Sequence, residues 1–189
     1  MKIFIGEKMR CVWASSSEEM QKYHDTEWGV PSHDERYFFE MLTLEAAQAG
    51  LSWATIIKRR VTYRQAYDNF DIEKVANFDQ VKRDSLLQDK GIIRNRLKVD
   101  SSINNAQIIQ TMHQNGETFF EYIWNFVDNQ QIINHYSDME EVPAQTELSQ
   151  RISKDLKKRG FRFVGPTIIY SFLQAVGVIN DHLDSCEFK

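Results

Sequence analysis

The sequence predicts an all-α protein, and three observations support that prediction. Several stretches place apolar residues at helical spacing. No stretch shows the alternation of apolar and polar residues that is typical of a half-buried strand. Only 3 prolines and 8 glycines occur among 189 residues, and no linker rich in serine, glycine or proline is visible. We therefore expect one domain of helices joined by short loops. The glycines placed to end helices or form turns are Gly50, Gly91, Gly116, Gly160 and Gly177.

The first strongly predicted helix spans residues 35–48. Phe38, Met41, Leu42 and Glu45 fall there at i, i+3, i+4 and i+7, which puts them on one face. A carboxylate therefore lies on an otherwise apolar face, either as a half-exposed helix residue or as a functional group.

Further along the chain, Asp71 stands where a helix N-cap is expected, just before an Ile-Glu-Lys run. Residues 119–127 and 167–176 are apolar nearly all round, which is typical of central helices. The longest weakly polar run, residues 165–179, is too short to cross a bilayer, so we expect no membrane role.

The sequence of residues 81–106 predicts two helices joined by a turn at residues 90–93. The second helix is expected to begin at about Arg94. Gly91 would let the backbone turn sharply and approach a ligand closely. The N–H groups at the start of the second helix would form an anion site that grips DNA phosphates without reading bases. An ordinary pair of packed helices is the alternative. The basic residues around this turn are Lys90, Arg94, Arg96 and Lys98.

Positive charge is concentrated in three segments, although the net charge is -4. Residues 58–64, 82–98 and 151–162 hold 16 of the 23 Lys and Arg but only 3 of the 27 Asp and Glu. This segregation predicts a basic face on an acidic body, as DNA binding requires. Three solvated helix faces that never converge are the alternative.

Two Cys-His pairs near the two ends of the sequence have the spacing of metal ligands. Cys11 precedes His24 by 13 positions, and His182 precedes Cys186 by 4. Two thiolates and two imidazoles complete a structural zinc site with no open position. Buried free cysteines with satisfied histidines are one alternative, and a disulfide is another. The disulfide is disfavoured because residues 1–10 lack a signal-peptide core, which makes us expect a cytoplasmic protein.

Common signatures of nucleotide-binding enzymes, serine hydrolases, zinc proteases and base deaminases are not found. Six segments, however, resemble the 3-methyladenine DNA glycosylase I family, in the same order across residues 9–186. These segments are Arg10–Trp13, Tyr23–Pro31, Leu44–Trp53, Gly91–Arg96, Lys157–Gly165 and Tyr170–Cys186.

The resemblance implies an all-α helix-hairpin-helix DNA glycosylase fold, with the hairpin near residues 81–106. It also implies one structural Zn²⁺ that joins the N- and C-terminal segments, and its ligands fall on Cys11, His24, His182 and Cys186. Residues 9–189 would form the glycosylase domain. Residues 1–8 would be a leader or extension ahead of the usual family start.

The implied activity is hydrolysis of the N-glycosidic bond of 3-methyladenine in double-stranded alkylated DNA, and 3-methylguanine is left open as a second candidate substrate. A flipped cationic purine would be held by aromatic faces and attracted by a carboxylate. Glu45 is the expected catalytic residue. The expected substrate-binding residues are Tyr23, Trp28, Trp53 and Gln48.

The family resemblance also suggests how DNA is held. Leu51 would be an apolar wedge that enters the gap left by the flipped base. Lys98 and Asp100 receive no catalytic role, so a monofunctional enzyme without lyase activity or nucleotide cofactor is expected, and it is expected to be a monomer. Met20 stands where some relatives have a pocket tyrosine. The expected DNA-binding residues are Gly50, Leu51, Lys90, Gly91, Ile92, Arg94 and Arg96.

Two other functions compete with this one. A zinc-clamped module that binds DNA without chemistry would not need Glu45 among pocket aromatics. A glycosylase for another lesion, such as an oxidised or mismatched base, would share the fold and release a different base.

Overall fold

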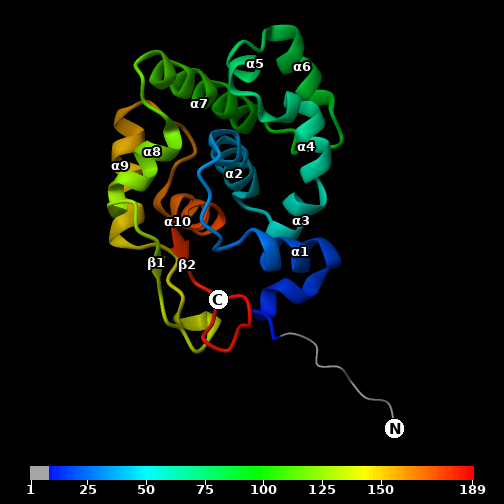
Figure 1. Ribbon diagram of the computed structural model, residues 1–189. Helices are drawn as coiled ribbons and strands as arrows, with labels where there is room; N and C mark the ends of the chain where they lie inside the picture. The colour runs from blue at the N-terminus through cyan, green and yellow to red at the C-terminus, as the bar shows by residue number, and fades with distance from the viewer. Residues whose placement is uncertain (1–8) are drawn as a thin grey trace.

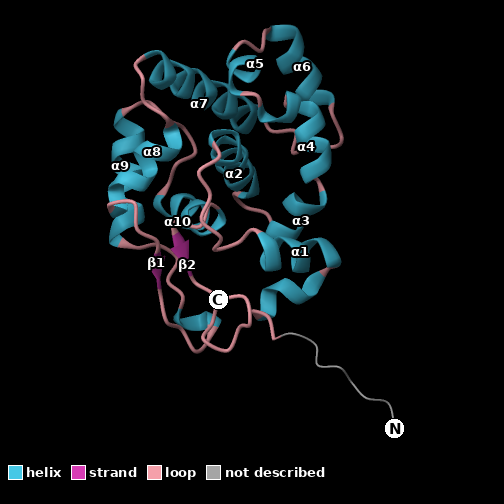
Figure 2. Ribbon diagram, in the orientation of Figure 1, coloured by secondary structure: helices cyan, strands magenta, loops and turns pink. Residues whose placement is uncertain are grey.

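A computed structural model describes residues 9–189, and the predicted leader, residues 1–8, lies outside the described part. The described chain is mostly helical, as the sequence predicts (Figures 1 and 2). The α-helices are α1 (Glu18–Thr26), α2 (Glu35–Gln48), α3 (Trp53–Lys58), α4 (Arg60–Ala66), α5 (Ile72–Ala76), α6 (Gln80–Gln88), α7 (Arg96–Gln114), α8 (Phe119–Trp124), α9 (Glu147–Lys158) and α10 (Pro166–Ala175). Short 3₁₀ segments occur at Val12–Ser16, Asp68–Phe70, Asn125–Val127 and Met139–Glu141.

Helix α2 is the centre of the fold, and it has the bounds that its periodicity predicts. Its N-terminus is capped by Asp34, whose carboxylate accepts a hydrogen bond from the N–H of Tyr37 at 2.9 Å. Every residue from Phe38 to Ala47 is buried, because α2 packs against α3, α7, α8 and α10. The backbone of residues 38–47 is therefore fixed by packing against four neighbouring helices.

The predicted pair of helices in residues 81–106 corresponds to α6 and α7, joined by residues 89–95. Helix α7 begins at Arg96 rather than at Arg94, because Asn95 is the N-cap and accepts the N–H of Lys98 at 3.2 Å. The cap predicted at Asp71 is confirmed: its carboxylate accepts the N–H of Lys74 at 3.1 Å.

A pair of two-residue strands departs from the all-helical prediction. Strand β1 (Ile132–Ile133) runs parallel to β2 (Ile179–Asn180), with Ile132 opposite Ile179. These strands are too short to show an alternating pattern in the sequence. The pairing fixes the backbone just before residues 181 and 182, which belong to the site described below.

The two ends of the described chain meet. The N–H of Glu187 donates to the carbonyl of Met9 at 3.0 Å. Figure 1 shows the C-terminus beside the start of the described chain. The final residues therefore close against the first ones.

The three basic segments do not form one patch, which corrects the expectation of a single basic face. Residues 58–64 lie on α3 and α4 and touch the α6–α7 turn, since Arg59 Nη1 donates to the carbonyl of Lys90 at 2.9 Å. Residues 151–162 lie on and after α9, and Figure 1 shows α9 on the other side of the domain from α4 and α6. Residues 58–64 thus meet the α6–α7 turn, whereas the third segment meets the middle of α7, where the carbonyls of Gly160 and Arg162 accept hydrogen bonds from Asn104 and Asn105. Among residues 9–189, no helix combines the length and apolarity needed to span a membrane.

Candidate functional site

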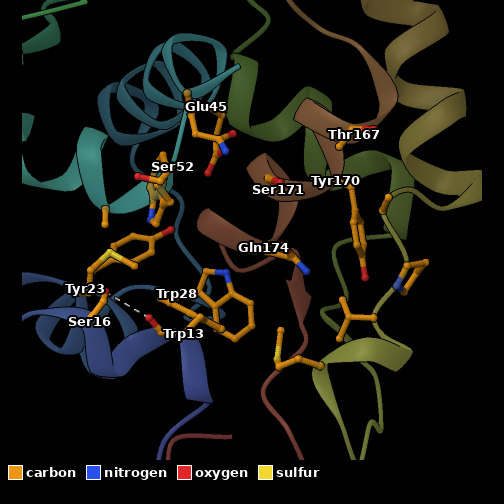
Figure 3. Close-up of a pocket in the computed structure, with 18 residues that line it drawn as sticks. Trp13, Ser16, Tyr23, Trp28, Glu45, Ser52, Thr167, Tyr170, Ser171 and Gln174 are labelled. Atoms are coloured by element: carbon orange, nitrogen blue, oxygen red, sulfur yellow. Dashed lines mark hydrogen bonds between the residues drawn. The ribbon is translucent and has the colours of Figure 1, made fainter. Parts of the chain in front are cut away.

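A cavity of about 440 Å³ lies between α1, α2, α3, α10 and the segment from Met139 to Ala144 (Figure 3). Its size falls in the range of small-molecule sites. The predicted substrate residues and Glu45 all line it. The other lining residues are Trp13, Ser16, Met20, Ser52, Ala54, Met139, Val142, Pro143, Ala144, Thr167, Tyr170, Ser171 and Gln174.

Aromatic rings form one side of the cavity. The rings of Tyr23 and Trp53 are 5.4 Å apart between centroids and inclined at 57°. Trp13 meets Trp28 edge-on, with centroids 5.0 Å apart. Tyr23 is almost wholly buried, and burial raises the pKa of its hydroxyl. These rings offer faces for a planar, electron-poor ligand.

Glu45 enters the cavity from α2 and has no partner of its own. It is 5% exposed, and no hydrogen bond or ion pair reaches its carboxylate from the described residues. Burial raises its pKa to about 8. An unpaired buried carboxylate is costly, so its persistence in a cavity indicates a functional role.

A second buried carboxylate on the same helix, Glu40, shows what a structural role looks like. Its Oε1 accepts hydrogen bonds from Arg60 Nε at 2.8 Å and from Arg64 Nε at 2.7 Å. Glu40 thus joins α2 to α4, whereas the carboxyl group of Glu45 makes no such contact.

Gln48 lines the cavity, but its amide nitrogen is already engaged. Nε2 donates to the carbonyl of Leu51 at 2.9 Å, and the N–H of Leu51 donates back to the carbonyl of Gln48 at 2.6 Å. The turn between them passes through Gly50, whose φ of +80° favours glycine. Leu51 lies at the tip of this turn and is 40% exposed.

Helix α10 contributes a polar stripe opposite Glu45, which sequence reasoning missed. Thr167, Tyr170, Ser171 and Gln174 fall at i, i+3, i+4 and i+7 and line the cavity together. This stripe could have been predicted from the sequence, because it consists of polar residues at helical spacing in an otherwise apolar helix. Trp13 was also missed, although it follows Cys11 by two residues.

The stripe is fixed from behind by Asp181, which is wholly buried. Its Oδ2 accepts the Tyr170 hydroxyl and, at 2.5 Å, Nε2 of Gln174. Its Oδ1 accepts Nδ2 of Asn134 at 2.7 Å. Three donors thus satisfy the buried carboxyl oxygens, and two of these donors are cavity side chains that Asp181 holds in place.

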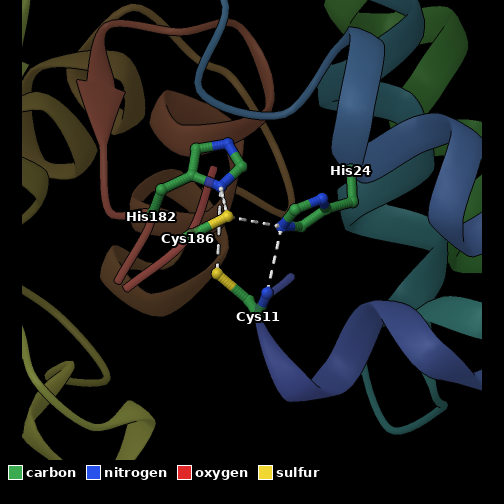
Figure 4. A group of neighbouring side chains, drawn as sticks. All are labelled: Cys11, His24, His182 and Cys186. Carbon is green, nitrogen blue, oxygen red and sulfur yellow. Dashed lines mark hydrogen bonds between the residues drawn. The ribbon is translucent and has the colours of Figure 1, made fainter. Parts of the chain in front are cut away.

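The four predicted metal ligands meet in one buried cluster (Figure 4). Their ligand atoms all lie within 4.8 Å of one another. Cys186 Sγ is 3.3 Å from His182 Nδ1 and 3.6 Å from His24 Nε2, and Cys11 Sγ is 3.8 Å from His182 Nδ1. A tetrahedral zinc with these ligands has sulfur–nitrogen edges of about 3.6 Å, so the cluster has the right size and donors.

The outer nitrogen of each histidine is also engaged. Nδ1 of His24 lies 2.8 Å from the Asp25 carboxylate, and Nε2 of His182 lies 2.9 Å from the carbonyl of Trp28. When these nitrogens carry the proton, they donate to both acceptors and leave the inner nitrogens free as ligands. Burial lowers both histidine pKa values, that of His182 to about 4, which favours the neutral, metal-binding form.

The predicted DNA-binding turn is partly used within the protein. The N–H of Gly91 donates to the Asp89 carboxylate at 2.7 Å, and that of Ile93 donates to the Tyr63 hydroxyl at 3.0 Å. The side chain of Ile92 is buried in the core rather than exposed. A Cβ on Gly91 would lie 2.8 Å from the Cβ of Thr62, so packing against α4 already requires a glycine at this position.

What remains open to an anion is the first turn of α7. The N–H groups of Arg96 and the next residue have no acceptor among residues 9–189. The side chains of Lys90, Arg94 and Arg96 are exposed nearby. Lys98, by contrast, points back into the protein: Nζ donates to the carbonyls of Ala47 and Ala49.

The chain is similar to known proteins in both sequence and structure. The sequence model of the methyladenine glycosylase family matches residues 13–189. DNA-3-methyladenine glycosylase 1 of Escherichia coli is 47% identical over 177 residues, which cover 94% of this chain and 95% of that protein.

Solved structures agree with that comparison. A crystal structure of 3-methyladenine DNA glycosylase I superimposes with a TM-score of 0.92 at 46% identity, covering 95% of this chain and 98% of that one. The Staphylococcus aureus enzyme, whose structure describes 3-methyladenine recognition, has a TM-score of 0.91 at 33% identity over 97% of this chain and 98% of its own. The chain therefore belongs to the methyladenine glycosylase family, whose members are hydrolases of the N-glycosidic bond.

Proposed function

We propose that this protein excises 3-methyladenine from alkylated double-stranded DNA by hydrolysing the N-glycosidic bond, without lyase activity. The relatives named for this activity support the substrate class. The observation that carries the proposal within this chain is Glu45: a buried, unpaired carboxylate among aromatic rings. Such a site is complementary to a planar cation.

The lesion itself supplies much of the driving force. Methylation at N3 gives the purine a positive charge, so the base leaves readily when the bond between C1′ and N9 breaks and the base keeps the electron pair. The sugar becomes oxocarbenium-like, water adds to it, and a proton is released. The protein has to extrude, select and hold the base rather than protonate it.

Selection would rest on the walls of the cavity. Tyr23 and Trp53 would stack on the cationic ring, and Glu45 would accept a hydrogen bond from the adenine edge. A bound cation favours the ionised carboxylate, so binding would lower the pKa of Glu45 from its value of about 8. Met20, 4% exposed, packs here where some relatives have a tyrosine, and it offers no hydroxyl.

DNA would be held at the α6–α7 unit, which we propose serves as the helix-hairpin-helix of the family. The free N–H groups at the start of α7 would bind a phosphate, with Lys90, Arg94 and Arg96 adding charge. Leu51, at the tip of its turn, would fill the gap left by the flipped base.

We further propose that the four-residue cluster holds one structural Zn²⁺, with residues 9–189 as the glycosylase domain. Two thiolates and two imidazoles leave no open position for a reacting water, so the metal would stabilise the fold and take no part in the reaction. Burial raises the pKa of the Cys11 thiol to about 11, and a bound cation would reverse that shift.

Incubation with methylated duplex DNA, followed by chromatography of the released bases, tests the activity. Release of 3-methyladenine supports the proposal, and the yield of 3-methylguanine measures the lesion range. If the protein binds the DNA but releases no base, it is a DNA-binding module without catalytic activity. Release of an oxidised or mismatched base instead, from duplexes that carry it, would identify another lesion as the substrate.

A further inference from the structure

Lys98 makes two unusual contacts for a lysine next to a proposed DNA-binding turn. Its Nζ donates to the carbonyl of Ala47 at 2.7 Å and to the carbonyl of Ala49 at 2.7 Å. These carbonyls belong to the end of α2, where helix geometry leaves acceptors unsatisfied and the dipole favours a cation. Partial burial lowers the pKa of Lys98, in keeping with an ammonium held against protein rather than solvent.

The carbonyls that Lys98 binds stand at the start of the turn that carries Leu51. The side-chain amide of Gln48 donates to the carbonyl of Leu51 itself. The turn is therefore held at two points, by the ammonium of Lys98 from α7 and by the amide of Gln48 from α2. Its tip remains exposed.

Lys98 is also the one hydrogen-bonded link, within residues 9–189, between α6 or α7 and residues 47–51. It comes from the first turn of α7, the same turn whose N–H groups remain open to an anion. The proposed phosphate site and the proposed wedge therefore meet through one side chain. Lys98 is not among the residues that line the cavity.

We propose that Lys98 is a positioning residue that sets the Leu51 turn relative to the start of α7. When α7 docks on the DNA backbone, this link would place Leu51 at the base stack in the register needed for extrusion. The proposal rests on the proposed function and adds to it a residue that acts through Leu51.

The test uses full-length Lys98→Met, which keeps the length of the side chain and removes its charge. The first readout is the ratio of affinities for a duplex with an abasic-site analogue and for the same duplex intact. The second is the affinity for free 3-methyladenine, followed by tryptophan fluorescence. Lys154→Met, an exposed lysine on α9, is the matched control.

Because Lys98→Met loses two hydrogen bonds from a charged group, we expect its ratio of affinities for the abasic-analogue and intact duplexes to fall by about tenfold. Affinity for the free base should stay within about twofold, because the cavity walls are untouched. Lys154→Met should match wild type in both readouts. In a cycle with Leu51→Ala, the double variant should lose no more than Leu51→Ala alone, because Lys98 acts through that residue.

An unchanged ratio in Lys98→Met, or additive losses in the cycle, would overturn the proposal. A parallel loss of free-base affinity would also overturn it, because it would mean a general structural role. Lys98→Arg keeps the positive charge and can donate to both carbonyls, so its ratio of affinities should lie between those of wild type and Lys98→Met. If Lys98→Met does not fold, Lys98→Arg replaces it in the test. If wild type releases no 3-methyladenine but the ratio still falls in Lys98→Met, the proposed function fails and the positioning role stands.

Discussion

Cys11 and Cys186 both lie beside His182. The Nδ1 atom of this histidine is 3.8 Å from the Cys11 sulfur and 3.3 Å from the Cys186 sulfur. The two cysteines come from opposite ends of the described chain. Trp28 connects this cluster to the cavity, because its carbonyl lies 2.9 Å from Nε2 of His182 while its ring lines the cavity. A metal bound here would stabilise one side of the base pocket from behind.

The first prediction concerns that metal. Protein purified without chelator should contain about one zinc per chain, and Cys186→Ser should lose it. Since metal binding at such a site adds to folding free energy, we expect Tm to fall by about 10 °C or more. Metal analysis and thermal denaturation measure both effects.

The exposed His135 serves as the control for the loss of a histidine outside the cluster, and His135→Gln should keep both zinc and Tm. Substoichiometric zinc in the wild-type protein, or an unchanged Tm in Cys186→Ser, would contradict the zinc assignment.

The second prediction concerns pH and Glu45. Burial raises its pKa from 4.5 to about 8 in the folded protein, so the folded state keeps a proton that the unfolded chain releases. The free energy of unfolding should therefore fall as pH rises from about 4.5 to 8, by up to about 1.4 kcal/mol per pH unit from this group.

Glu45→Gln removes this titration. Urea unfolding at several pH values should show that the free energy of unfolding of the variant rises relative to that of wild type as pH rises. The difference should be largest above pH 8. Parallel curves for the two proteins would mean that Glu45 is not held in the buried, unpaired state.

The third prediction concerns Asp181. Asp181→Asn would turn an amide donor toward groups that are themselves donors, so we expect a loss of about 3 kcal/mol in unfolding free energy. Affinity for 3-methyladenine should fall too, because Tyr170 and Gln174 lose their anchor. Asp184→Asn, at an exposed neighbour, should stay within about 0.5 kcal/mol of wild type. Equal stability of Asp181→Asn and wild type would contradict the anchoring role.

Much of the fold could be predicted because its signals are local. The bounds of α2 and the cap at Asp71 follow from periodicity and side-chain type within one turn. The four Cys and His residues of the buried cluster could be predicted to meet because few residue types bind zinc.

The partners of Lys98 and Asp181 could not be predicted, since they lie tens of residues away in the sequence and nothing local marks them. The close approach of Gly91 to Thr62 could not be predicted either, since a glycine leaves the same sequence signal whatever its neighbour is.

Release of 3-methyladenine from methylated duplex DNA by wild type and Glu45→Gln tests the central claim most directly. Both proteins should fold, bind zinc alike and bind undamaged duplex alike. Wild type should release the base, and Glu45→Gln should release it about a hundredfold or more slowly, because it lacks the charge that attracts the cationic base. Equal rates of release from the two proteins would contradict the account.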